Sequence, residues 1–230
     1  MLTRAVRRFL CLLIAPVMFT GCVQVEQTLS LDAEGGGVLT VQYSMTLEKL
    51  AELEARAREE AGDDADAAIP SPLAYDEAQI REDFKEYEPM GVTLLEARTW
   101  EEGGSKHVRL KMKFTSFAGL GQTEFLSDRT LKLVRVDDAY EFSQMAPESA
   151  AVEDEMYDFM VGMMKGFRAT LSIETPGDIL DSNSDETDGR KASWRFDLAK
   201  DPDALKRAQQ LNLRVRFSAE GLALAEFPEP

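Results

Sequence analysis

Regular alternation of apolar and polar residues is the feature that most constrains the fold of this chain. Residues 23–31 and 39–45 alternate with period two, and a glycine-rich acidic turn at 32–37 separates them. Because successive side chains of a strand point to opposite faces, this pattern predicts a hairpin with one covered and one solvated face. Further strands are predicted in a hairpin at 92–116, a hairpin at 130–145, and single strands near 168–174, 194–198 and 211–217.

Helical segments lie between these strands. Thr46 is expected to cap one helix and Asp76 a second one, which ends at Gly91. Further helices are predicted over 152–166 and after Asp201. Strands and helices that are segregated along a chain favour an α+β fold. We expect an antiparallel sheet of about eight to nine strands, built from hairpins, with helices packed mainly on one face.

The N-terminal segment has the parts of an export signal. Three arginines within the first eight residues precede an apolar run at 9–20, which is shorter than the roughly 20 residues of a spanning helix. Small residues and Cys22 follow, and they resemble a bacterial lipobox. This resemblance implies cleavage before Cys22, acylation of its thiol and anchoring in a membrane. An uncleaved anchor and ordinary cleavage near Gly21 are the alternatives.

These observations predict the domain organisation and the location. Residues 1–21 form the signal peptide, 22–220 a single α+β domain with an acidic helical insert at about 46–90, and 221–230 a C-terminal tail. The protein is expected in the cell envelope, anchored on the outer side of the cytoplasmic membrane. Val23 follows Cys22, and by resemblance to diderm lipoproteins this implies the outer membrane in a diderm host.

Charge and composition exclude several functions. The chain carries 42 acidic against 26 basic residues, a net charge of −16, so we expect no nucleic-acid binding, which requires clustered cations. Removal of the signal peptide removes three arginines and no acid, which gives −19, and the body should then stand off anionic head groups. One histidine, two cysteines and no catalytic motif predict no metal, no cofactor and no enzymatic activity.

The segment 152–166 carries the sharpest apolar pattern. Large side chains recur at helical spacing on one face, namely Met156, Phe159, Met160, Met163 and Met164. Methionine is flexible and is frequent at adaptable apolar binding surfaces, so this face is a candidate wall of an acyl-chain pocket. The alternative is that the same face packs on the sheet as ordinary core.

Cations alternate with apolar residues on two predicted strands. The candidate residues for binding an anionic group are Arg109, Lys111, Lys113, Arg214 and Arg216. If the two strands are neighbours, an acidic protein acquires a basic sheet face that can receive a lipid phosphate or an acidic partner. The alternative is cross-strand pairing with Asp and Glu on a solvated face.

Several motifs together resemble a known family. A lipobox cysteine runs directly into a strand, and Gly91-Val-Thr-Leu94, the stretch from Pro176 to Asn183, Gly189 and Trp194 follow. The chain is similar in these motifs to LppM-type bacterial lipoproteins. The resemblance implies an α+β envelope domain with lipid or glycolipid binding, and it brings no catalytic residues. The acidic insert departs from the family pattern.

Two functions are therefore weighed. The first is an exported, lipid-anchored, non-enzymatic lipoprotein that binds a lipid or other amphiphile between the methionine-rich helix and the sheet. The alternative is a structural or assembly lipoprotein that binds another envelope protein through its acidic helices. That alternative requires an exposed apolar strip at Leu47, Leu50 and Leu53.

Overall fold

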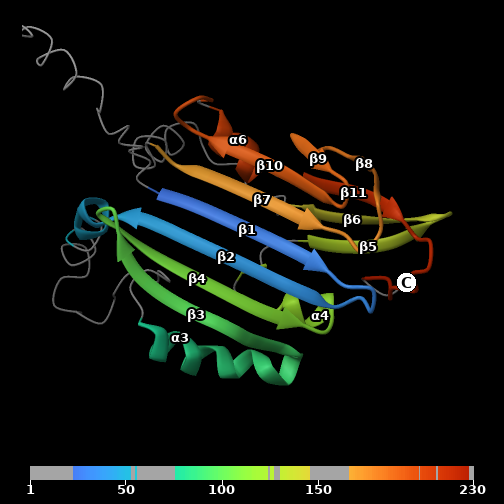
Figure 1. Ribbon diagram of the computed structural model, residues 1–230, viewed down its shortest axis with the longest axis horizontal. Coiled ribbons are helices and arrows are strands. Elements are labelled where there is room, and N and C mark those ends of the chain that lie inside the picture. The colour runs from blue at the N-terminus through green and yellow to red at the C-terminus, as the bar shows by residue number, and fades with distance from the viewer. Residues whose placement is uncertain are drawn as a thin grey trace, which may run out of the picture.

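The strands of the protein are arranged in two sheets (Figure 1). The computed structural model describes residues 23–52, 55, 76–123, 125–126, 130–145, 166–201, 203–210 and 212–227. The first sheet has the order β3-β4-β2-β1-β7-β10-β9 and the second has the order β5-β6-β11-β8. The predicted α+β class is confirmed.

The first sheet consists of β1 (Val23–Leu31), β2 (Gly37–Thr46), β3 (Val92–Glu102), β4 (Ser105–Phe114), β7 (Arg168–Glu174), β9 (Glu186–Asp188) and β10 (Lys191–Asp197). The second consists of β5 (Thr130–Val136), β6 (Ala139–Met145), β8 (Ile179–Ser182) and β11 (Asn212–Ser218). The helices are α3 (Glu77–Asp83), the 3-10 helix η1 (Phe84–Met90), α4 (Phe117–Leu120) and α6 (Ala204–Gln209).

The sheet arrangement differs from the expected one in two respects. The described residues form eleven strands in two sheets instead of about eight to nine in one. The first sheet is mixed, because β1 and β7 pair in parallel, with Gln24 opposite Arg168. The hairpins β1–β2, β3–β4 and β5–β6 form as the turn signals indicated. The pairing of β1 with β7 joins segments far apart in sequence, and no local signal encodes such a pair.

The two faces of the first sheet differ as the alternation predicted. Leu29, Leu39 and Met112 lie in register on one face and are almost completely buried. The ring of Phe117 on α4 lies 5.7 Å from that of Phe114 on β4 and 5.6 Å from that of Phe142 on β6. This chain of aromatic contacts joins the apolar faces of the two sheets in one core. The opposite face of the first sheet is polar.

The helix caps predicted at Thr46 and Asp76 are present, whereas α6 has Asp203 and not the expected Asp201 as its N-cap, without a side-chain capping bond. The Thr46 hydroxyl accepts the backbone N–H of Lys49 at 3.3 Å, and residues 47–52 are helical. The Asp76 carboxylate accepts the backbone N–H of Gln79 at 2.8 Å at the start of α3. Gly91 ends η1 with φ of 79°, which favours glycine because it has no Cβ. The helix predicted over 152–166 lies outside the described residues, apart from Gly166.

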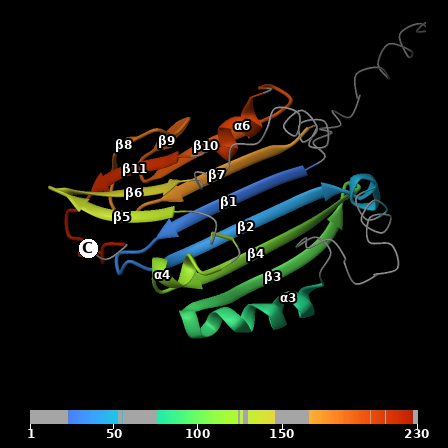
Figure 2. The same cartoon turned by 180° about the vertical axis from the view of Figure 1, so that it is seen from behind.

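Helix α3 protects the exposed edge of the first sheet, and it runs beside β3 in both views (Figures 1 and 2). The Glu77 carboxylate accepts the backbone N–H of Thr99 at 2.9 Å, and the Arg81 guanidinium donates to the carbonyl of Ala97 at 3.1 Å. These bonds satisfy edge groups that another strand could otherwise pair with.

The C-terminal segment protects the edge of the second sheet. Phe227 exchanges two backbone hydrogen bonds with Leu133 of β5, at 2.7 and 2.8 Å. Its ring also lies 6.1 Å from that of Phe117. A segment without a recognisable pattern in the sequence thus packs against the core.

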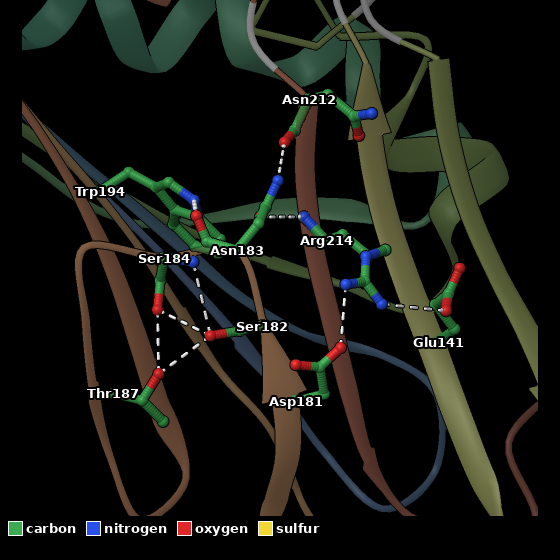
Figure 3. A network of polar contacts seen from close by, with 9 residues as sticks. All are labelled: Glu141, Asp181, Ser182, Asn183, Ser184, Thr187, Trp194, Asn212 and Arg214. Atoms are coloured by element: carbon green, nitrogen blue, oxygen red, sulfur yellow. Dashed lines mark hydrogen bonds and ion pairs between the residues drawn. The ribbon is translucent and has the colours of Figure 1, made fainter.

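The chain passes from the second sheet to the first at Asn183 (Figure 3). Its side-chain amide donates to the carbonyl of Asn212 at 2.6 Å and accepts the backbone N–H of Arg214 at 2.9 Å. Its backbone carbonyl accepts the indole N–H of Trp194, in the first sheet, at 3.0 Å. Asn183 therefore holds β11 on one side and β10 on the other.

Candidate functional site

The candidate site is a strip of cations on the polar face of the first sheet. Arg109, Lys111 and Lys113 project from alternate positions of β4, between β2 and β3. The intervening residues of β4 are buried in the core, so the alternation fixes the direction of the cations. Lys111 and Lys113 are exposed, and Arg109 is half-buried.

The structure does not bring the two predicted groups of cations together. Arg214 and Arg216 lie on β11, which belongs to the second sheet. Arg214 forms ion pairs with Asp181 at 2.8 Å and with Glu141 at 3.7 Å (Figure 3), and Arg216 pairs with Asp138 at 3.7 Å. These two arginines follow the cross-strand pairing that was weighed as the alternative.

The strip on β4 is different, because its cations form no ion pair with a described carboxylate, although Glu96 of β3 lies opposite Lys111 in the strand pairing. Within the part of the chain that the structure describes, no carboxylate forms an ion pair with Arg109, Lys111 or Lys113. The guanidinium of Arg109 instead donates twice to the amide oxygen of Gln42, at 3.0 and 2.7 Å. A neutral partner leaves the positive charge of the guanidinium available to a ligand.

A second arginine increases the positive charge of this site. Arg98 on β3 lies directly opposite Arg109 in the β3–β4 pairing. Both guanidinium groups lie over the ring of Trp100, at 5.2 and 5.7 Å from its centroid, and His107 stacks on the same ring at 4.9 Å. Like charges placed directly opposite each other destabilise a sheet. Departures from stability rules of this kind are expected at functional or strained sites, and this makes the arginine pair a candidate for ligand binding.

A hollow of about 250 Å³ lies on the polar face beside this cluster. Its lining is formed by Glu26, Thr28, Thr40, Gln42, Glu96, Arg109 and Lys111. Small-molecule pockets usually measure about 300–1,000 Å³ and are mostly apolar. The carboxylates of Glu26 and Glu96 balance the charges of Arg109 and Lys111 in this lining. The hollow therefore suits a small polar group rich in hydroxyl groups, with an anionic part on the side of the two cations, and its polar lining does not suit an acyl chain.

A second hollow, of about 440 Å³, lies at one end of β7 and β10. Three of its four cations are paired with carboxylates that also line it, and the fourth, Arg195, is paired with Glu186. Arg168 and Lys200 lie 3.4 and 3.6 Å from Asp197, and Arg207 lies 2.8 Å from Asp201. An anion here would have to displace these carboxylates, so this hollow is a weaker candidate than the strip on β4.

The structure describes only some of the other residues that the sequence predicted for a site. Cys22 and the five residues of the methionine-rich face lie outside the described residues. The apolar strip of the acidic helix does not form a continuous exposed surface, because Leu50 is buried and Leu47 is 37% exposed. Leu53 lies outside the described residues.

Sequence reasoning missed the partners that define the site. Arg98 and Trp100 alternate on β3, and this signal could have been read beside the cations of β4. Gln42 carried no signal of its own, because its role depends on the register between β2 and β4.

The fold and the site together define a class of protein: an α+β domain whose described residues include a cationic strip, without ion pairs, on the polar face of a mixed sheet. Residues 65–208 match the family model of the LppM domain, which is well over half of the chain. The protein belongs to the LppM family. The family name denotes a lipoprotein, in agreement with the lipobox, and the family indicates an envelope location.

One similar solved structure is the NMR structure of the folded domain of LppM from Mycobacterium tuberculosis. It shares 10% identity with this chain at a TM-score of 0.45, covering 86% of this chain and 90% of that one. No curated protein matches the chain. None of the helices in the described ranges has the length and the apolar character needed to cross a membrane.

Proposed function

We propose that this protein is an exported, lipid-anchored envelope lipoprotein that binds an amphiphile with an anionic head group, and that it is not an enzyme. The observation that carries the proposal is the set of unpaired cations on β4 and β3. Arg98 and Arg109 are the anion-binding residues, with Lys111 and Lys113 extending the strip.

The shape of the site supports a head group as the ligand. The hollow beside Arg109 is polar and small, and its threonines and glutamine can exchange hydrogen bonds with hydroxyl groups. The apolar part of the amphiphile must then lie elsewhere. The predicted methionine-rich helix, residues 152–166, remains our candidate for that part.

The proposal is tested by mass spectrometry of lipids that co-purify with the full-length Cys22→Ser variant, which cannot carry acyl chains of its own. A bound lipid with a phosphate or carboxylate head group is expected. When Arg98→Gln/Arg109→Gln is added to Cys22→Ser, the protein should retain at least about tenfold less lipid than Cys22→Ser alone. The reason is that charge-assisted hydrogen bonds each contribute about 1.5–3 kcal/mol to binding.

The matched control is Lys132→Gln/Lys206→Gln, which removes two exposed cations outside the site, on β5 and α6. This control should retain the lipid. Equal lipid retention in both double variants would exclude the cationic strip as the binding site.

A further inference from the structure

The first strand of the protein has no linker between it and the predicted lipid. Strand β1 begins at Val23, one residue after Cys22, and it lies inside the first sheet between β2 and β7. Val23 pairs with Met45 and Gln24 pairs with Arg168, so the strand is held on both sides from its start. An acyl chain on Cys22 therefore fixes which end of the sheet faces the bilayer.

The register then places the cationic cluster near that bilayer. Trp100 and His107 lie in the cross-strand row that contains Gln24, and Arg98 and Arg109 lie in the next row of the same face. A strand rises about 3.3 Å per residue, so these rows lie about 7 and 13 Å from Cys22 along the strand. The head-group layer on each side of a bilayer is about 5–8 Å thick, so the row of Trp100 lies within it and the row of Arg98 and Arg109 lies just outside it.

The side chains at this corner suit a membrane interface. Tryptophan is enriched at the head-group level of membranes, and the indole of Trp100 is half-exposed. At this corner Arg98, Lys106 and Arg109 offset the exposed Glu101 and Glu102, and the adjoining helical segment 47–52, bonded to Gly104, adds Glu48, Lys49 and Glu52. The corner therefore carries as many cations as carboxylates, whereas the body as a whole is strongly acidic.

We propose that the corner formed by the β3–β4 hairpin docks on the bilayer that holds the acyl chains of Cys22, with Trp100 in the head-group layer and with Arg98 and Arg109 at its outer surface. The inference rests on the lipid anchor of the proposed function. The basic strip then meets the phosphates of the protein's own membrane, and an amphiphile reaches the hollow from that bilayer.

The two tryptophans provide the test. Trp194 is 5% exposed, whereas Trp100 lies at the corner, so Trp194→Phe leaves a single reporter at the proposed contact. The full-length protein, expressed with its lipid, is reconstituted in vesicles of equal phosphatidylcholine and phosphatidylglycerol that carry a nitroxide quencher near the head group. The fluorescence of Trp100 should fall by at least half. A quencher placed deep in the acyl region should reduce this fluorescence less than the quencher near the head group does.

The matched control is Trp100→Phe, whose remaining Trp194 should keep its fluorescence. The difference between the wild type and Trp100→Phe reports Trp100 even if Trp194→Phe folds poorly. Vesicle-bound protein in which the shallow quencher leaves Trp100 unchanged would overturn the docking. Protein that fails to float with the vesicles would overturn it as well, because the anchor is its premise.

The docking and the proposed function fail separately. If the Cys22→Ser protein retains an anionic lipid while Trp100 of the anchored protein is not quenched, the docking is wrong and the binding function stands. If Trp100 is quenched but no lipid co-purifies with the Cys22→Ser protein, the corner touches the membrane and the binding function is wrong.

Discussion

Replacing Asn183 by alanine should weaken the junction between the two sheets. The substitution removes the amide that donates to the carbonyl of Asn212 at 2.6 Å and accepts the N–H of Arg214 at 2.9 Å. Each such bond contributes about 1 kcal/mol net, and water partly replaces them because Asn183 is exposed. We expect a loss of about 1.5 kcal/mol in the free energy of unfolding, or about 3–6 °C in Tm.

Two further variants make this prediction specific. Asn183→Asp keeps the acceptor for the Arg214 N–H and loses the donor to the Asn212 carbonyl, so about half of the destabilisation is expected. Asn212→Ala is the matched control, because Asn212 contributes its backbone carbonyl to the junction and the substitution leaves that carbonyl in place. It should stay within about 0.5 kcal/mol of the wild type.

Urea and thermal unfolding, followed by circular dichroism, measure these differences. The fluorescence of the buried Trp194 gives a second measurement of unfolding at this junction, because its indole N–H donates to the backbone carbonyl of Asn183. If Asn183→Ala and Asn212→Ala unfold at the same urea concentration, the hydrogen bonds of the Asn183 side chain do not stabilise the junction and the reasoning is refuted.

Three other predictions concern the sheet edge, one carboxylate and the anchor. Glu77→Ala should free the edge N–H of Thr99 and raise the tendency to associate, which light scattering against concentration would detect; an unchanged mass would contradict it. The Ser30 hydroxyl and then Lys191 lower the pKa of Glu174, so this carboxylate stabilises the fold above about pH 4.3, and the stabilisation is lost as pH falls through its folded pKa. Ser30→Ala should raise that pKa in an NMR titration and flatten the acid dependence of stability, and an unmoved titration would refute the role of Ser30. Cys22→Ser should release the protein from membranes into the soluble fraction, and unchanged membrane retention would rule out the lipid anchor.

Local sequence signals were sufficient to predict many of the individual strands and helices. The hairpins follow from alternation and turn residues, and the caps at Thr46 and Asp76 follow from side chains that satisfy early backbone N–H groups. About ten residues of helix are expected after Asp201, and α6 has six. The polar stretch at 179–188 holds the two short strands β8 and β9, which were not predicted. Such short elements depend on neighbours that pair with them, so their own sequence is a weak guide.

The division into two sheets could not be read from the chain. It depends on the parallel pairing of β1 with β7 and on the junction between the two sheets at Asn183. Both bring together segments that are distant in sequence. The entropy of closing long loops is offset only when many contacts form together, so a long-range pair leaves little local trace.

The two groups of cations show most clearly what the sequence decides and what the tertiary structure decides. By itself, the sequence determined that Arg109 and Arg214 project from alternating strands onto polar faces, because a strand has period two. Only the tertiary structure decided their roles. Strands β6 and β8 bring Glu141 and Asp181 to Arg214, whereas β2 and β3 bring Gln42 and Arg98 to Arg109. One arginine is neutralised and the other keeps its charge, because the neighbours of a strand are set by packing across the whole molecule.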